Sequence, residues 1–482
     1  MTSTQPNSPL DVEALPGLQR LLALLLVGGL LAILALRTTT SFDPFPAWAS
    51  DPLLVASPVV AVTPALALAL DVLTLLISGA LLVLLARRAI APTLVELGLF
   101  LSGTVAIILH ALVFSSRTLD DVIIGSSWLS AIGAGIDISV AAGVPLLRAL
   151  IAGTFAALAA AFALRAGVQV FVDHPQTVRM FRETRATFFA SQGWTEGSSM
   201  ALAYERRLMQ AEGSAWFGLA NVLATTGATT LTLALGLITS RMTPGWPLGW
   251  PGGPRRSFSS SRPPLALIIL ALLSLATVIL AGSKGGYAAA LLGVTLIALS
   301  HIAPRLVTSA RARLAAGLLG PLLIALVLIA VAVRGLLGER FGELSLLFRA
   351  FYFEGAIRIF IEHPLLGVGP AGFKDAYMLV KPALAPEDVS SPHSVLFDYA
   401  ACLGVLGLGW AALLILWSSH AGRSILSATR TVDVAPSTAL TDVAADADVD
   451  AEAITQAAAL RTPFLAILAL STGVASVIER PM

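Results

Sequence analysis

The stretch PALALALDVLTLLISGALLVLLA at residues 64–86 decides the fold class. It contains one charged side chain, Asp71, and about 20 mostly apolar residues are enough for a helix to cross a bilayer. Similar stretches recur along the 482-residue chain, in which 56% of the residues are hydrophobic and 12% are charged. Soluble domains carry about 25% charged residues. The sequence therefore predicts an all-α fold, a polytopic bundle of membrane helices.

About 11–12 spans are predicted, from eleven candidate segments: 17–36, 64–86, 90–115, 127–147, 148–166, 215–239, 263–282, 285–303, 312–333, 395–417 and 462–478. The first segment follows a leader that is not basic before Arg20, and Arg37-Thr-Thr-Thr is a poor cleavage site. We therefore interpret it as a retained span and not as a signal peptide. The segment 127–147 is the weakest candidate because it holds Asp137 and several glycines, and a re-entrant or peripheral position stays open for it.

The distribution of Lys and Arg orients this bundle. With the N-terminus in the cytoplasm, the short inward connections hold eleven arginines, and the short outward connections hold Arg37, Arg117 and Lys284. Positive residues favour the cytoplasmic side, so this orientation is the expected one. Two long segments, 167–214 and 334–394, then face outward.

These long segments divide the chain into three parts. Residues 1–333 are expected to form membrane helices with an outward segment at 167–214, in which Asp173-His-Pro would cap a helix. Residues 334–394 form a large, partly helical outward loop. Residues 395–482 form the last membrane helices, interrupted at 420–460 by an acidic stretch that is too poor in apolar surface to order itself. We predict that this stretch is a disordered cytoplasmic linker.

Cysteine and histidine usage limits the chemistry of the chain. The single cysteine, Cys402, excludes an intrachain disulfide and a cysteine metal site. The six histidines show no metal-ligand spacing, so no metal is expected. The net charge of +1 argues neither for nor against nucleic acid as a partner.

The outward loop holds residues that do not suit lipid. Arg349 precedes Phe351-Tyr-Phe, and helical spacing places Arg349, Phe353, Ala356 and Phe360 near one face. We expect an amphipathic helix at the outer membrane surface, ended by His363-Pro and the Gly367-x-Gly-Pro turn. Arg349 could handle an anionic group there. The alternative, that it reaches for lipid headgroups from an interfacial helix, is equally open.

His393 and Lys284 are the other polar candidates on the outward side. Pro392 precedes His393 and an apolar run begins at Val395, so His393 is expected at the mouth of a span. Neutral imidazole suits a general base near pH 7, although a residue that starts a helix near headgroups is an equally good interpretation. Ser283-Lys284-Gly-Gly forms a tight outward turn in which lysine could contact phosphate; alone, this signal is weak.

Four ionisable residues fall inside predicted spans, where they are costly and become functional candidates: Asp71, Glu96, His110 and Asp137. Asp71 and Glu96 lie near span ends, so an interfacial position is expected for both. His110 and Asp137 lie deeper, and a pairing between them inside the bundle is open.

The loop resembles the signature of the O-antigen ligase and O-antigen polymerase family. Arg349, an aromatic residue four positions later, Gly355-Ala356 and the run HPLLGVGP at 363–370 follow the family's arginine, aromatic, small residues and "hPllGvGp". Weaker likenesses extend the resemblance over residues 200–420: 212–221, Ser283-Lys284-Gly285, Pro392-His393-Ser394 and 403–407. Three positions depart from the family: Phe353 replaces tryptophan, Lys284 replaces arginine and Ser394 replaces asparagine.

The resemblance implies a multi-pass glycosyltransferase of the bacterial inner membrane. Members of the family take a glycan from undecaprenyl diphosphate on the periplasmic side and place it on lipid A core, on a growing polymer or, in some branches, on protein. For this chain it implies a lipid-linked glycan donor, a glycan or lipid A-core acceptor, membrane lipids as surroundings and no nucleic acid. The outward segments would then be periplasmic.

A mechanism follows from that resemblance together with the charges. Arg349, and after it Lys284, would bind the diphosphate and stabilise the charge that develops on it. His393 would take the proton of the acceptor hydroxyl. Arg358, Glu354 and Asp375 are supporting candidates. A one-step displacement would invert the anomeric centre, and the activated leaving group removes the need for a metal or another cofactor.

Two other classes of protein stay open. A secondary transporter of a small anion is suggested by Asp137 and His110 inside spans, but the two related halves typical of such proteins are not found in the sequence. A structural or scaffolding subunit would leave Arg349 and His393 without a role.

Overall fold

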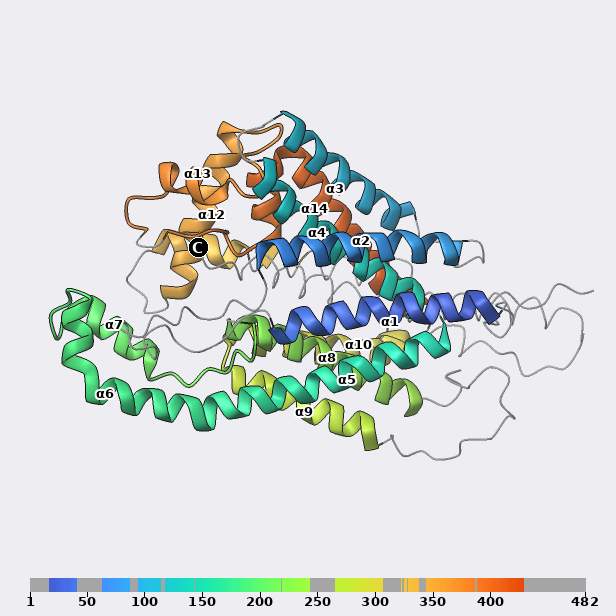
Figure 1. The fold of residues 1–482 in the computed structure, drawn as a ribbon, viewed down its shortest axis with the longest axis horizontal. Coiled ribbons are helices and arrows are strands. Elements are labelled where there is room, and N and C mark those ends of the chain that lie inside the picture. The colour runs from blue at the N-terminus through green and yellow to red at the C-terminus, as the bar shows by residue number, and fades with distance from the viewer. Residues whose placement is uncertain are drawn as a thin grey trace, which may run out of the picture. The chain divides into compact units, whose positions relative to one another are not determined.

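The computed structural model describes residues 17–40, 63–86, 94–113, 118–142, 144–217, 219–242, 265–306, 328–337, 344–385 and 388–428, with 322, 325 and 326. The described residues form helices and connections, and contain no strand (Figure 1). Seven described helices are long and apolar enough to cross a membrane. The predicted fold class, a polytopic helical membrane protein, is therefore confirmed. The number of spans stays a prediction, because 462–478 and most of 312–333 lie outside the described residues.

The chain divides into two compact units. The first contains α2 (Pro64–Ala86), α3 (Leu94–Val113), α4 (Thr118–Ala142), α12 (Leu344–Glu362), α13 (Phe373–Val380) and α14 (Val395–Ala428), with the start of α1 (Gly17–Thr40). The second contains most of α5 (Pro145–Val168), then η3 (Gln169–Asp173), α6 (His174–Ser191), α7 (Ser199–Leu208), α8 (Ala220–Met242), α9 (Leu265–Ala281) and most of α10 (Lys284–Leu306).

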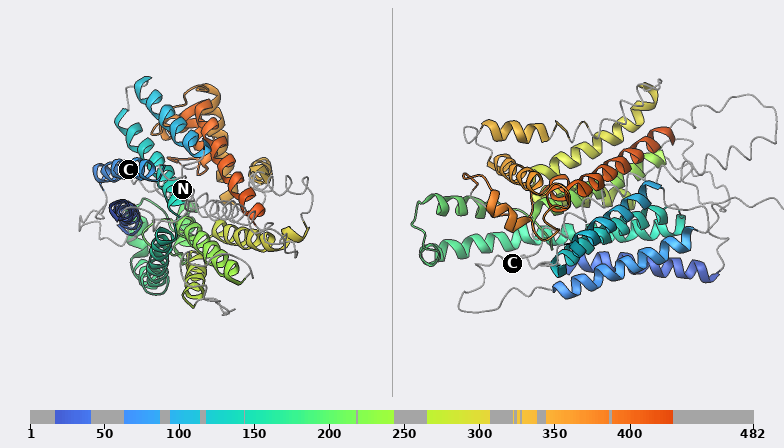
Figure 2. Two further views of the ribbon diagram at one scale, coloured as in Figure 1. Left: turned by 90° about the vertical axis from the view of Figure 1, so that its right-hand side faces the viewer. Right: turned by 90° about the horizontal axis from the view of Figure 1, so that it is seen from above.

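The helix α4 lies at the centre of the first unit, beside α2 and α3 (Figure 2). Most of it is buried, so the peripheral position considered for 127–147 is wrong. The burial is possible because polar side chains on α4 serve buried carboxylates: Ser127 and Ser130 donate hydrogen bonds of 2.7 and 2.6 Å to Asp71. Asp71 itself is fully buried within the protein. Its expected depth near the membrane interface stays a prediction.

Two of the other three buried ionisable side chains also have partners inside the first unit. Trp417 donates a 3.2 Å hydrogen bond to Glu96, which is 5% exposed. His110 lies against Asp121, with 3.2 Å between Nδ1 and Oδ2. Asp137 is fully buried near Ser78, and its carboxylate accepts no hydrogen bond from the described residues. The pairing of His110 with Asp137 that the sequence left open is thus replaced by the contact of His110 with Asp121.

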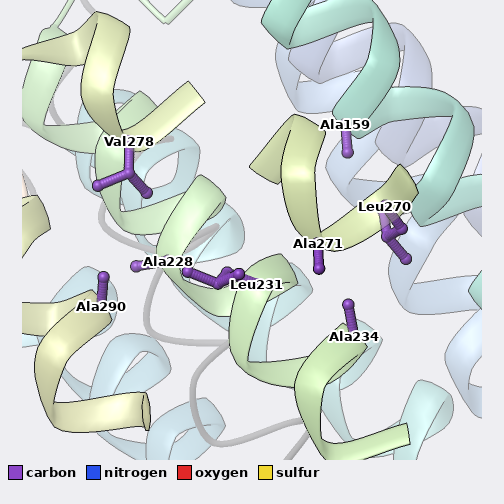
Figure 3. Close-up of a cluster of buried hydrophobic side chains, with 8 residues drawn as sticks. All are labelled: Ala159, Ala228, Leu231, Ala234, Leu270, Ala271, Val278 and Ala290. Atoms are coloured by element: carbon purple, nitrogen blue, oxygen red, sulfur yellow. The ribbon is translucent and has the colours of Figure 1, made fainter. Parts of the chain in front are cut away.

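Small residues hold the second unit together. One cluster of its core consists of eight side chains, five of them alanines: Ala159, Ala228, Leu231, Ala234, Leu270, Ala271, Val278 and Ala290 (Figure 3). Small side chains let membrane helices approach closely, which increases their van der Waals contact. Gly286 shows how close this approach is, since a Cβ added there would lie 2.2 Å from the Ala224 Cβ.

The polar segment 167–214 is largely helical, but it does not begin as predicted. The helix α5 continues through the π-turn η3 into α6 without a break, as Figure 1 shows. Asp173 makes no capping hydrogen bond and instead pairs with Arg165 at 2.7 Å. The expected cap at Asp173-His-Pro is therefore wrong. Pro175 lies directly after the π-turn, at the second residue of α6.

The end of α14 corrects one further boundary. The predicted linker was to begin at residue 420, but α14 remains helical to Ala428. The remainder of that linker lies outside the described residues.

Candidate functional site

Arg349 lies on a helix, as the sequence predicted. The helix α12 buries Tyr352, Ala356 and Ile359, which are at most 4% exposed, against the first unit. Arg349 is half-buried one turn before Tyr352. Among the described residues, none forms a hydrogen bond or ion pair with Arg349. Its guanidinium is therefore not occupied by any described part of the chain.

His393 lies two residues before α14 in an unusual backbone conformation. Its φ is +55°, a region that residues with a side chain rarely adopt. Its N–H donates a 3.0 Å hydrogen bond to the Ser391 Oγ, and that hydroxyl donates a 2.9 Å hydrogen bond to Asp398. Such strain persists only where surrounding contacts hold it, and it gathers at functional sites.

Aromatic contacts bring the start of α14 against α12. The imidazole of His393 packs edge-on against Tyr352, with 5.7 Å between ring centroids. Phe353 stacks on Phe397 at 4.2 Å. Arg349 is one turn from Tyr352, so Arg349 and His393 belong to the same side of α12. An apolar groove lies between α12 and α14, and Phe397 is one of the residues that line it.

The Gly-rich turn after α12 completes a broken helix. At Gly404, φ is 62° and ψ is −140°, which interrupts α14. The Ala401 and Cys402 carbonyls, deprived of their usual donors four residues on, accept from Val368 N–H at 3.0 Å and Gly369 N–H at 2.9 Å.

The exchange of hydrogen bonds is reciprocal. The Val405 N–H, whose helical acceptor is now taken, donates to the Pro364 carbonyl at 2.8 Å. A Cβ at Gly367 would lie 2.3 Å from the Cys402 carbonyl carbon. Gly367 and Gly404 are thus required by the close approach of two backbones, and the broken segment keeps its polar groups satisfied within protein.

The same turn is anchored on its other side by α3 and α4. Asp121 accepts a 2.9 Å hydrogen bond from the Ala371 N–H. A Cβ at Gly369, where φ is +90°, would lie 2.5 Å from the His110 ring and 2.6 Å from Asp121. The buried His110–Asp121 pair therefore supports the turn, a role that the sequence did not indicate.

The three supporting candidates have different surroundings. Arg358 pairs with Glu354 one turn earlier and donates to the Val380 carbonyl at 3.2 Å. It therefore ties the end of α13 to α12, and Glu354 is engaged by the same contact. Asp375 is exposed in the first turn of α13. The geometry does not bring Arg358 or Glu354 to His393.

Lys284 begins α10 in the second unit. It is exposed, and Ser283 caps the helix by accepting a 3.3 Å hydrogen bond from the Gly286 N–H. The turn was expected to use its glycines to admit phosphate. Instead Gly286 admits Ala224, whereas a Cβ at Gly285 would meet only the Ser283 hydroxyl at 3.8 Å.

A buried glutamine holds the segment behind this turn. Gln169 accepts hydrogen bonds from the Ser214 and Ala215 N–H groups at 2.9 and 2.7 Å and donates to the Ala215 carbonyl at 2.9 Å. The neighbouring Gly213 N–H donates to the Leu280 carbonyl at 2.9 Å, just before the turn. Gln169 thus fixes the backbone of residues 213–215, which contacts the segment just before the Lys284 turn.

Sequence reasoning missed several of these residues. Ser391, Asp398 and Gln169 are ordinary polar residues whose partners lie on other segments or in the next helix, and no spacing rule identifies them. The sequence also did not predict the positive φ of two non-glycine residues, His393 and Ala215. Within the described part of the chain, no cluster of three histidine, cysteine or acidic side chains could hold a metal.

Residues 269–411 match the family model described as O-antigen ligase. The matched range contains Lys284, Arg349, Arg358 and His393, and it reaches from α9 into α14. No curated protein matches the chain. The match supports the resemblance to the O-antigen ligase and polymerase family, and it indicates a membrane glycosyltransferase of that type.

Proposed function

We propose that the chain transfers a glycan from undecaprenyl diphosphate to an acceptor hydroxyl at the periplasmic face of the bacterial inner membrane. The observation that carries the proposal is the meeting of α12 and α14, where Tyr352 contacts His393 one turn from an unoccupied Arg349. A cation and an imidazole on one side of a helix are the two groups that such a transfer needs. The N-terminus would be cytoplasmic and the segments 167–214 and 334–394 periplasmic.

Arg349 serves the leaving group in this proposal. The bond between the anomeric carbon and the diphosphate oxygen breaks, and its electron pair stays on the diphosphate. A preorganised guanidinium next to lipid stabilises that charge more than water would. The apolar groove that Phe397 helps to line offers a surface on which the lipid chain of the donor could lie.

His393 serves the acceptor. The acceptor hydroxyl oxygen forms the new bond to the anomeric carbon while the imidazole takes its proton. The attack comes from the side opposite the diphosphate, so the anomeric configuration inverts in a single step. The diphosphate is already a good leaving group, so the proposed reaction is independent of a metal.

Lys284 would add a second contact to the diphosphate. A lysine offers a point charge where the family has arginine, so the contact lacks a bidentate geometry. Its part in the proposal rests on the matched sequence and its exposure at the start of α10. Asp375 stays a supporting candidate. The acceptor, whether lipid A core or a growing polymer, decides between a ligase and a polymerase.

Arg349→Ala tests the proposal. We expect normal folding and membrane insertion and a loss of glycan transfer of about 1000-fold, as for the removal of a charge-stabilising group. The measurement is transfer in proteoliposomes supplied with lipid-linked glycan extracted from host cells that lack the protein. Arg179→Ala, which removes an exposed arginine from α6, is the matched control. Near-normal transfer by Arg349→Ala would exclude Arg349 from the mechanism.

His393→Ala separates chemistry from binding. As a general base, His393 should contribute about 100- to 10,000-fold to the transfer rate. The affinity for undecaprenyl diphosphate, measured directly, should change little. Equal losses in rate and affinity would instead assign His393 a positioning role.

The transporter alternative has some support in the broken helix α14 and the buried carboxylates of α2 to α4. Transporters place such breaks around a cavity. Here the groups freed at Gly404 bond to residues 364–369, and Asp71 bonds to serines, which favours a packed structure. Uptake of labelled anion into vesicles without lipid-linked glycan would decide for the transporter. A scaffolding subunit would show neither uptake nor transfer.

A further inference from the structure

His393 needs contacts that hold its backbone. Its φ of +55° is a conformation that glycine adopts freely and that histidine leaves unless neighbouring groups fix it. The imidazole is exposed, and it packs against the Tyr352 ring. A hydrogen bond to the backbone N–H of His393 would restrain this φ directly.

Ser391 supplies it from two residues before. Its side chain is 2% exposed, and its Oγ accepts the His393 N–H at 3.0 Å. A serine hydroxyl has one proton, and here that proton is directed to the Asp398 Oδ2 at 2.9 Å. Donation to Asp398 leaves a lone pair of the hydroxyl facing the His393 N–H.

Asp398 is itself fixed by the helix that it begins. It lies in the first turn of α14, and its N–H donates to the Ser394 carbonyl at 2.8 Å. The bonds form a closed path from the helix to Asp398, to Ser391 and to the backbone of His393. On the other side, the Tyr352 ring meets the imidazole edge.

We propose that Ser391 and Asp398 are positioning residues that hold His393 in its left-handed conformation and so aim the imidazole at the acceptor hydroxyl. Neither touches the substrate. The inference rests on the proposed role of His393 as the general base. It adds that the base is effective because a buried hydroxyl and a half-buried carboxylate fix its backbone.

Kinetics of matched variants test this inference, with extracted lipid-linked glycan as the donor. A misplacement of about 1 Å can cost about 100-fold in rate, so Ser391→Ala and Asp398→Ala should lower kcat by about that factor while the KM for the donor stays within about twofold. Ser391→Thr keeps a hydroxyl and Asp398→Asn keeps an acceptor oxygen, and both should retain most of kcat. Ser390→Ala, one residue earlier and exposed, is the control.

A double variant distinguishes a positioning role of Ser391 from a purely structural one. In the His393→Ala background, Ser391→Ala should cause no further loss of kcat, because the group that it positions is gone. Independent, multiplied losses would overturn the inference, as would an equal loss in Asp398→Asn and Asp398→Ala. Thermal unfolding identifies variants that do not fold; if Ser391→Ala is one, Asp398→Asn compared with Asp398→Ala decides.

The proposed function fails separately. If His393→Ala retains normal transfer, His393 is not the base, whatever Ser391 does. If His393→Ala is inactive and a folded Ser391→Ala is normal, the base stands and the positioning role is wrong. Activity in His393→Ala together with its loss in Asp398→Asn would transfer the role of base to Asp398.

Discussion

His393 in the first unit and Ala215 in the second share a feature that no other described non-glycine residue has, a positive φ. The backbone N–H of each donates a hydrogen bond to one buried polar side chain, Ser391 for His393 and Gln169 for Ala215. They differ in exposure: the His393 side chain faces solvent, whereas Ala215 is fully buried. The same strain thus occurs at the proposed base in one unit and at a buried backbone support in the other.

The glycine-rich turns of the two units differ in a related way. At Gly367 and Gly404 the missing side chain makes room for another backbone, and hydrogen bonds form across the contact. At Gly286 it makes room for a side chain of the neighbouring helix, without such bonds. In the first arrangement a substitution breaks several backbone hydrogen bonds at once, so we expect a large loss of stability. In the second it only crowds a packing contact, so we expect a smaller loss.

Gly404→Ala should have the largest effect. Its backbone conformation costs a residue with a side chain about 1–3 kcal/mol, and the new Cβ would lie 2.6 Å from the Leu365 and Pro364 carbonyl oxygens. We expect little folded protein in a thermal unfolding assay in detergent. Gly409→Ala, on the same helix with open space around it, should be neutral or slightly stabilising. Similar melting temperatures for the two variants would contradict the account of the broken helix.

Gln169→Ala should come next. It leaves the Ser214 and Ala215 N–H groups and the Ala215 carbonyl without their partner, at about 1–3 kcal/mol for a buried group. Gln169→Glu keeps an acceptor for the two N–H groups but sets a buried carboxylate against the Ala215 carbonyl, so it should not restore the thermal stability. If the segment supports Lys284, Gln169→Ala and Lys284→Ala should weaken undecaprenyl diphosphate binding by similar factors. An unchanged affinity in Gln169→Ala would confine Gln169 to stability.

Gly286→Ala and Gly285→Ala form a matched pair in the second turn. The Cβ of the first would meet Ala224 at 2.2 Å, and overpacking typically costs about 1–3 kcal/mol. The second has no close neighbour and should melt like the parent protein. Equal melting temperatures would show that α8 and α10 can separate to admit a methyl group.

Lys284→Arg should be tolerated, with transfer within about threefold of the parent, because either cation can contact an exposed diphosphate. The same proteoliposome assay measures it. An inactive Lys284→Arg variant would mean that the turn is packed too closely for the larger side chain. Close packing would then limit the substitutions that are tolerated at a candidate site residue in both units.

The smallest effect concerns Asp388, after α13. A hydrogen bond from Lys381 and the charge of that lysine lower the pKa of Asp388 below its usual value near 3.8. The pair therefore stabilises the fold above that usual value, and the contribution is lost as the pH falls through the lowered pKa. Both side chains are partly solvated, so Asp388→Asn should lower the melting temperature at pH 7 only slightly and reduce the destabilisation at acid pH. A large drop at pH 7 would contradict this.

The parts of the fold that depend on local pattern were predictable. Long apolar stretches gave α2 and α3, and the aromatic face of 349–360 gave α12, because both follow from helical spacing. The missed features depend on distant partners: Asp71 is buried because α4 brings two serines to it, and the break at Gly404 is stable because residues 364–369 pair with it. The sequence singled out His393, Arg349 and Lys284, and their roles stay predictions. It did not single out Ser391, Asp398 or Gln169, since single polar residues show no period.

The exchange of hydrogen bonds at Gly404 has a consequence for biogenesis. Residues 364–369 leave the ribosome before α14, so the donors and acceptor that seal its break already exist when the helix enters the bilayer. A translocon that releases α14 before this earlier segment has docked would leave two carbonyls and one amide facing hydrocarbon. Assembly of the last described helix is therefore coupled to the order of synthesis, and circular permutation between residues 370 and 393 should disturb it.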